Sequence, residues 1–224
     1  FEGVDMSGKP MRESNFSEAN LKNADLSGAD RSRSNFSGAD FNGTSLTRAD
    51  MQGSDLNGTN LDRANLLGMW FDENTIWPPG FDYINSGAFG PGVDFRSLDI
   101  SSFNAYRKDL AGANFEGVDM SGKPMRESNF SETNLKNADL SGANRSKSNF
   151  NNAILVGTNL SADLSNSTFV NAIFSENTIW PEGFDPIAAG AILIRPPSSI
   201  DLNGSSILEN QITGTVVGRF NVTD

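Results

Sequence analysis

Aspartate is the residue in this chain whose type and spacing most suggest chemistry, because it recurs at five-residue intervals and supplies a carboxylate each time. Carboxylates brought together in this way could serve as general acids and bases. Asp also tolerates the left-handed backbone region and hydrogen-bonds its own backbone, so it favours turns. The regular spacing therefore predicts turn residues, and we assign no catalytic role to the series Asp25, Asp30, Asp40, Asp50 and Asp55.

The sequence lacks the two residue types most used in catalytic and metal sites, since it contains no Cys and no His. Disulfides, thiolate metal ligands and Cys nucleophiles are therefore excluded, as are the commonest general base and the commonest transition-metal ligand. No Gly-rich phosphate loop and no calcium-binding repeat of the GGxGxD type occurs. We predict a protein that is not an enzyme, with no catalytic, cofactor-binding or metal-binding residue and no cofactor.

The elements that must position these turns are pentads with a large apolar residue at the centre, such as Leu21, Leu26 and Phe36. A period of five keeps one face apolar on neither a helix nor a flat strand, so it indicates a repeat architecture. The residue two positions before the centre is usually small, and the residue just before it is usually Asp or Asn. Such a chain must coil around a thin apolar axis, and its backbone groups must pair with the coils above and below.

The segments ANLKNADLSGAD and TRADMQGSDLNGTNLDRANL resemble the A(D/N)LXX pentads of pentapeptide-repeat proteins. The resemblance covers most of residues 1–71 and 95–174. It implies an all-β fold, a right-handed quadrilateral parallel β-helix with four pentads per coil. A run of pentads followed by T-I-W-P-x-G-F-D is similar to many cyanobacterial members of this family, which implies a cyanobacterial source.

An internal duplication divides the chain, because residues 115–150 repeat residues 1–36 with only three changes. We predict a first run with its cap over residues 1–90, a second run with its cap over 91–193, and a linker-like tail over 194–224. The chain begins within a repeat, so we expect a fragment or a processed form. Whether the two runs form one continuous solenoid or two stays open at this point.

Two steps of the first run break the pentad pattern, and both recur in the second copy. Lys9 and Pro10 replace the small residue and the Asp or Asn, which predicts a bulge or bend because Pro donates no hydrogen bond. Arg31 occupies a centre, where an unpaired guanidinium would be very costly. We expect the backbone to turn Arg31 outward; the alternative is a buried ion pair or a functional basic spot. The duplicated exceptions are Lys123, Pro124 and Arg145.

Each run ends in an aromatic segment that fits a cap. Trp77 and Phe81 follow the first run, and Trp180 and Phe184 follow the second. The open end of a β-helix exposes core and unpaired backbone, so a cover is needed. An aromatic binding patch is the alternative. We also expect an irregular corner at residues 161–162, where one residue is missing from the pentad spacing.

The formal net charge of −11 argues against direct nucleic-acid binding, which needs a basic surface. No apolar run is long enough to span a membrane, and the compartment stays open between cytoplasm and a luminal or periplasmic space. We predict a non-catalytic rigid scaffold that binds a protein partner, with self-association through the solenoid ends as a further route. The alternatives are an acidic DNA mimic that inhibits gyrase, as some members of the family do, and a structural spacer of a larger protein.

Overall fold

The computed structural model describes residues 1–195, which contain no helix. Its two named strands are short, with β1 at Ile173–Phe174 and β2 at Ile192–Leu193. They pair in parallel, with Ile173 opposite Ile192. Along the rest of this part of the chain, isolated parallel bridges join one coil to the next. The fold is therefore all-β, and its repeating unit is the coil rather than a long strand.

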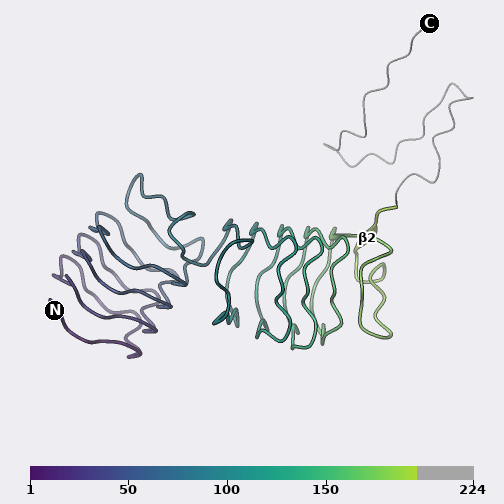
Figure 1. Ribbon diagram of the computed structural model, residues 1–224, viewed down its shortest axis with the longest axis horizontal. Coiled ribbons are helices and arrows are strands. Elements are labelled where there is room, and N and C mark those ends of the chain that lie inside the picture. The colour runs from purple at the N-terminus through teal and green to yellow at the C-terminus, as the bar shows by residue number, and fades with distance from the viewer. Residues whose placement is uncertain (196–224) are drawn as a thin grey trace, which may run out of the picture. The chain divides into compact units, whose positions relative to one another are not determined.

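Each coil contains four pentads, because most bridges join residues that lie twenty positions apart, as Asn15 and Asn35 do. A typical bridge consists of two backbone bonds: the Leu21 N–H donates to the Asp40 carbonyl at 2.9 Å, and the Asp40 N–H donates to the Ala19 carbonyl at 2.9 Å. Figure 1 shows these coils following one another along the chain. The structure is thus a parallel β-helix, with its ladder running between coils.

The corner of each pentad is a turn that Asp or Asn stabilises. The Ala24 N–H donates to the Leu21 carbonyl at 3.0 Å, and Asn23 between them has φ of 56°. A positive φ at the third residue is typical of a type II turn. The side chain of Asn20 accepts a 3.1 Å bond from the Lys22 N–H. The predicted turn role is confirmed by the same bond at Asp25, Asp30, Asp40, Asp50 and Asp55.

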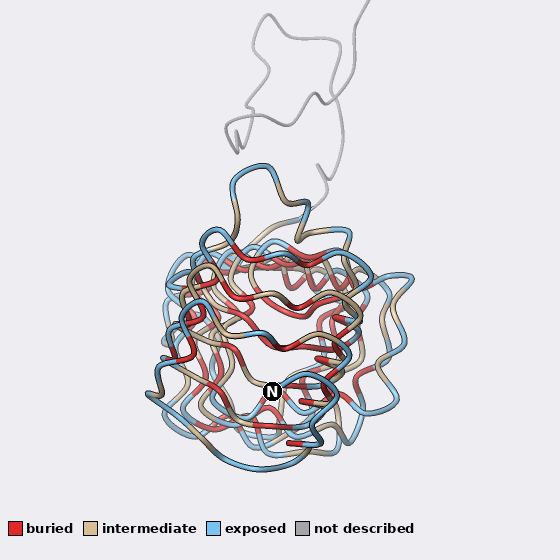
Figure 2. Cartoon of the chain, turned by 90° about the vertical axis from the view of Figure 1, so that its left-hand side faces the viewer, coloured by how far each residue is buried: buried red, intermediate tan, exposed pale blue. Residues whose placement is uncertain are grey.

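The core is a narrow column inside the coils. Centre residues such as Leu21 and Phe36 are fully buried, as are small residues such as Ala29. In Figure 2 the buried segments lie on the inner side of the coils and the exposed segments at the corners. Phe16 and Phe36 stack with ring centroids 5.1 Å apart, one coil above the other. Each fully buried Leu or Phe contributes about 1.5–3 kcal/mol of transfer free energy, before the cost of ordering the chain.

The one-residue slip predicted at residues 161–162 is confirmed. Three successive bridges across it join residues nineteen rather than twenty positions apart, as in Asn149 with Thr168. The chain tightens locally, since the Ala162 N–H donates to the Leu160 carbonyl at 2.6 Å. The irregular corner absorbs the missing residue, so the core column continues through Phe169.

The ladder divides the coils into two stacks. We call residues 1–89 the first stack and residues 94–194 the second stack. No bridge in residues 1–195 joins a residue up to Phe89 to a residue from Asp94 onward. The stacks nevertheless share one hydrophobic core, because Trp70 and Phe103 approach to 5.5 Å between ring centroids and Phe89 and Phe95 to 5.2 Å.

Residues Phe1–Ile194 form one compact unit. The boundary that we predict between residues 90 and 91 lies inside this unit and stays a prediction. All but the first two residues of the predicted tail, 194–224, lie outside the described residues.

The hydrogen bonds that Asp side chains accept in the turns make the free energy of unfolding depend on pH. Hydrogen bonds from Ser121 hold the pKa of Asp119 below its ordinary value of 3.8, and those from Ser165 do the same for Asp163. The folded pKa is thus lower than the unfolded pKa. This stabilisation is therefore complete above the unfolded value and is lost as the pH falls through the folded value.

We expect the variant Asp119→Asn/Asp163→Asn to lose less free energy of unfolding than the parent protein between about pH 5 and about pH 2. The amide can still accept the turn bond, but it does not titrate. The second copy already contains such a turn, because Asn144 accepts a 2.8 Å bond from the Ser146 N–H where the first copy has Asp30. Urea unfolding at several pH values measures the effect. The reverse change, Asn144→Asp, should steepen the acid dependence, and an equal slope in all three proteins would contradict the prediction.

Candidate functional site

The ladder is interrupted at Pro10, where the sequence predicts a bulge or bend. Pro10 forms no bridge with Asp30, although the equivalent residues of the neighbouring pentads, Asp5 and Asn15, bridge normally to the next coil. A residue that precedes proline is sterically restricted to extended backbone angles, and this restriction applies to Lys9. The Lys9 carbonyl does not accept the ladder bond that the Asp30 N–H would otherwise donate. One carbonyl next to the core therefore needs another donor.

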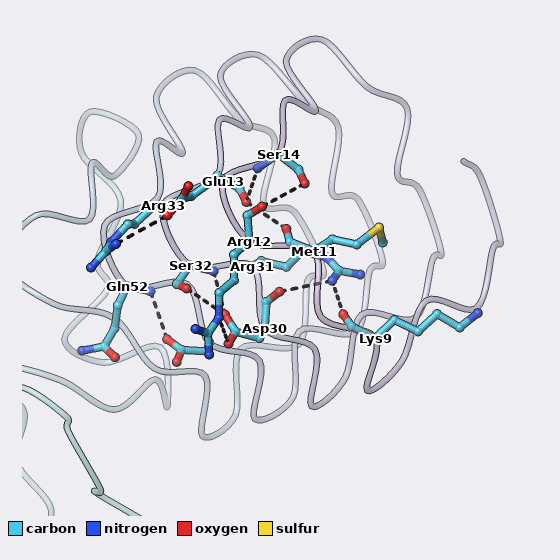
Figure 3. A network of polar contacts seen from close by, with 12 residues as sticks. Lys9, Met11, Arg12, Glu13, Ser14, Asp30, Arg31, Ser32, Arg33 and Gln52 are labelled. Atoms are coloured by element: carbon cyan, nitrogen blue, oxygen red, sulfur yellow. Dashed lines mark hydrogen bonds and ion pairs between the residues drawn. The ribbon is translucent and has the colours of Figure 1, made fainter.

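Arg31 supplies that donor from inside the core (Figure 3). Its side chain is fully buried, so the expectation that the backbone turns it outward is wrong. Nη1 donates to the Lys9 carbonyl, and Nη2 donates to the Met6 carbonyl at 3.3 Å. The alternative expectation of a buried ion pair is also wrong, because the guanidinium binds backbone carbonyls rather than a carboxylate. The coil geometry that Pro10 produces explains why Arg is accommodated at a centre.

The second copy repeats this arrangement. Arg145 is fully buried and donates to the Lys123 carbonyl at 2.7 Å and to the Met120 carbonyl at 3.2 Å. Pro124 again forms no bridge with the following coil. Burial lowers the pKa of Arg145 to about 10, so the side chain still carries its charge at neutral pH. Burial likewise lowers the pKa of Arg31.

Neither buried arginine is accessible to a partner. Hydrogen bonds from a charged donor contribute about 1.5–3 kcal/mol each, whereas desolvating the ion costs several kcal/mol, so the bonds offset the cost of burial only in combination. Nε finds no partner in either case. The structural or interaction role that we predict for Lys9, Pro10 and their duplicates stays a prediction.

An aromatic segment near the end of each stack lies against large apolar residues of the core. Trp77 stacks on Phe81 with ring centroids 5.4 Å apart and meets the ring of Phe71 edge-on. In the second copy Trp180 stacks on Phe184 at 5.1 Å and meets Phe174 edge-on. Both Trp rings are half-buried. The repeated contact with the end of a core column favours the predicted capping role, which stays a prediction.

A groove lies where the two stacks meet, with a volume of about 960 Å³. The first stack contributes Arg33 and Arg48, and the second contributes Tyr106 and Arg107. Lys108 connects the walls, because its ammonium group pairs with the Asp50 carboxylate and donates to Gln52 Oε1 at 2.9 Å. The same ammonium lies 5.6 Å from the centroid of the Trp70 ring. The groove is therefore concave, polar and lined by cations and aromatic rings.

Sequence reasoning did not identify this groove. Arg33 and Arg48 are recognisable as outward cations, but nothing in the pentad pattern places them opposite residues 102–108. The one sequence feature that marks this segment is Ala105, a small residue where the pentad spacing calls for a large apolar one. Within the described part of the chain there is no group of three or more Asp or Glu residues arranged to hold a metal ion. The same residues include no helix long and apolar enough to cross a membrane.

A family model described as pentapeptide repeats matches this chain in eight copies, over residues 1–30, 32–68, 109–144 and 128–175. Among curated proteins, none matches the sequence.

Several solved structures are similar to the chain. HetL, a pentapeptide repeat protein involved in heterocyst differentiation regulation in the cyanobacterium Nostoc sp. strain PCC 7120, is 25% identical, with 88% of this chain and 78% of HetL covered and a TM-score of 0.32. QnrB1, a plasmid-mediated fluoroquinolone resistance protein, is 19% identical, with 85% and 92% covered and a TM-score of 0.40. A pentapeptide repeat protein of the Arabidopsis thaliana thylakoid lumen is 21% identical, with 71% and 67% covered and a TM-score of 0.19. At these TM-scores the likenesses carry no functional argument.

The substitution Arg145→Leu should lower the free energy of unfolding by about 2 kcal/mol or more, because each buried carbonyl left unpaired costs about 1–3 kcal/mol. Adding Lys123→Ala and Pro124→Asp restores an ordinary pentad, in which the Asn144 N–H can donate to the carbonyl of residue 123. We expect this triple variant to recover most of the loss. Urea unfolding followed by circular dichroism measures both effects.

The variant with Lys123→Ala and Pro124→Asp alone is the control, and it should be destabilised because the ladder then competes with Arg145 for the same carbonyl. The three substitutions should thus be strongly non-additive. Additive effects would show that Pro124 and Arg145 act independently.

Removing the aromatic cap should destabilise the second stack. Trp180→Ala should cost about 2–3 kcal/mol, below the usual value for a fully buried aromatic residue because the ring is half-buried. It should also promote association through the uncovered end, which size-exclusion chromatography with light scattering would detect. Ile179→Ala is the matched control, since this neighbouring side chain is 53% exposed and should have little effect. Equal behaviour of the two variants would argue against a capping role.

Proposed function

Because the chain belongs to the pentapeptide-repeat family, we propose that it acts as a non-catalytic, rigid protein-interaction scaffold. The proposal includes the right-handed, quadrilateral form of the coil that the family resemblance implies. In this form the core column is closed to solvent and the corners and faces carry the side chains that meet a partner.

The observation that carries the proposal is that outward side chains of successive coils are hydrogen-bonded to one another and so are held in fixed positions. Asn129 Nδ2 donates to Asp109 Oδ1 at 2.8 Å, and Asn149 Nδ2 donates to Asn129 Oδ1 at 3.1 Å, so one row is hydrogen-bonded across three coils. Side chains held in this way lose little further conformational entropy when a partner binds. A regular and pre-ordered surface suits recognition better than it suits chemistry.

The state of the carboxylates supports a non-catalytic role. Ser165 donates from its backbone N–H to Asp163 at 2.9 Å and from its hydroxyl to the same oxygen, and these bonds lower the pKa of Asp163. Asp119 is held in the same manner by Ser121. A general acid needs a raised pKa near the working pH, which is the opposite shift. These carboxylates serve as hydrogen-bond acceptors within their turns.

Affinity capture combined with hydrogen exchange tests the proposal. The full chain, immobilised, should retain a protein from a cyanobacterial lysate in a saturable manner, and free chain should displace it. Hydrogen exchange of the purified complex should then show protection that is confined to one outward face of the coils rather than spread over the whole chain. The row at Asn129 and Asn149 provides a directed variant, because Asn129→Lys/Asn149→Lys changes one face while the core is left intact.

Two results would contradict the proposed scaffold function. Absence of any saturable partner would favour a structural spacer. Inhibition of DNA supercoiling by gyrase at micromolar protein would favour nucleic-acid mimicry, which the outward cations Arg33, Arg48 and Arg63 oppose, since they interrupt the acidic faces.

A further inference from the structure

We propose that the groove between the two stacks binds an acidic peptide segment of a partner protein. The proposal rests on the scaffold function and names the part of the surface that recognises the partner. Three properties of the groove carry it: its concave shape, two arginines that are available to a ligand, and a carboxylate acceptor beside an aromatic surface.

The shape comes from two walls of different origin. In the first stack, the corners of successive coils lie one above the other, since the Glu13 N–H donates to the Ser32 carbonyl at 3.0 Å and the Arg33 N–H donates to the Gln52 carbonyl at 2.8 Å. Figure 3 shows Glu13, Arg33 and Gln52 following one another along this wall. Residues 102–108 of the second stack form the facing wall. The volume of about 960 Å³ is enough for several residues of extended peptide.

Cations gather in this groove although the chain as a whole is acidic. Five of the 17 Lys and Arg residues of the chain line it, against three carboxylates from Glu13, Asp50 and Asp72. The lining residues alone thus carry two more positive than negative charges, and Asp30 and Glu127 just outside the lining neutralise Arg12 and Arg107. The positive charge that remains for a ligand is that of Arg33 and Arg48. The five cations are Arg12, Arg33, Arg48, Arg107 and Lys108.

Two arginines of the groove, Arg33 and Arg48, are available to a ligand, whereas Arg12 pairs with Asp30 and Arg107 pairs with Glu127. Arg33 pairs with Glu13 at 3.5 Å, with side-chain exposures of 77% and 68%, and such exposed pairs contribute about 0–1 kcal/mol. Arg48 is exposed and makes no ion pair with any of residues 1–195. A ligand carboxylate can therefore replace Glu13 at little cost, and the planar guanidinium can bind it in a bidentate manner.

The remaining lining favours a peptide over a nucleic acid. Asp72 Oδ1 accepts the Gly53 N–H at 2.7 Å, which leaves Oδ2 as an acceptor that suits an N–H group of a peptide backbone, whereas a phosphate backbone offers no donor to it. Tyr106 is 39% exposed and carries the Arg107 guanidinium 4.9 Å from its ring centroid, which makes a rigid aromatic surface beside a cation. The net negative charge of the chain also repels a long polyanion, but it acts weakly on a short acidic segment surrounded by local cations.

Fluorescence anisotropy with the full chain tests the groove. The probe is a fluorescein-labelled peptide of alternating Asp, Glu and Trp, and the comparison probes are the same peptide with Lys in place of the acidic residues and a labelled single-stranded oligothymidine. We expect saturable binding of the acidic peptide only. Arg33→Glu and Arg48→Glu should each weaken it at least tenfold, which corresponds to about 1.4 kcal/mol.

Arg63→Glu is the matched control. Arg63 is exposed, occupies the same pentad position as Arg33 and Arg48, and has nearly the same positive φ of 56°, but it does not line the groove. Glu is compatible with this backbone, because Glu13 and Glu18 have φ of 55° and 59°. The control variant should bind as the parent does, and NMR of the Arg Nε–Hε groups should show shifts for Arg33 and Arg48 but none for Arg63.

Each contrary outcome is decisive. Equal weakening by all three charge reversals would mean non-specific attraction and would overturn the groove. Preference for the oligothymidine would assign the groove to nucleic acid instead. Lack of binding to all probes would overturn the groove alone, because capture of a saturable partner on other faces would still support the scaffold.

Discussion

Hydrogen bonding between the backbones of successive coils is the constraint on which the rest of this structure depends. A coil of four pentads cannot satisfy its own N–H and C=O groups, so each group must find a partner in the coil above or below. Pairing at a spacing of twenty residues places the same pentad position in the same place on every coil. Large apolar residues therefore stack inside, turn residues stack at the corners, and a change at one position affects its neighbours in two coils.

The two buried arginines follow from this constraint rather than contradicting it. Burial of a guanidinium is costly by itself, but Pro10 leaves the Lys9 carbonyl without its ladder donor at the edge of the same core. An unpaired carbonyl and an unpaired guanidinium are each unfavourable, and together they satisfy one another. The duplication retains the whole combination while Ala19, Asp30 and Arg33 have changed, so the second copy preserves both partners of the interaction.

Regular features of the fold could be predicted from the sequence because each depends on one local rule repeated many times. The pentads predict the coil, Asp25 and its equivalents predict the turns, and the missing residue predicts the slip at 161–162. Arg31 could not be placed correctly, because its burial depends on a carbonyl that belongs to another coil and is exposed to the core only when Pro10 has altered the backbone. The groove was also beyond prediction. It requires residues 12–74 and 102–108 to face each other, and no repeat rule relates these segments.

The interruption of the ladder explains why recognition chemistry should concentrate between the stacks. Within a stack, adjacent coils lie about 4.8 Å apart, so their faces are flat and no cleft as large as a peptide can open between them. A concave surface requires coils that do not pair, and in the described residues the ladder stops between Phe89 and Asp94. The aromatic contact of Trp70 with Phe103 and the ion pair of Lys108 with Asp50 hold the two walls together there. The same break that removes backbone pairing thus creates a recess that the regular repeat cannot form, and the outward cations of both stacks line it.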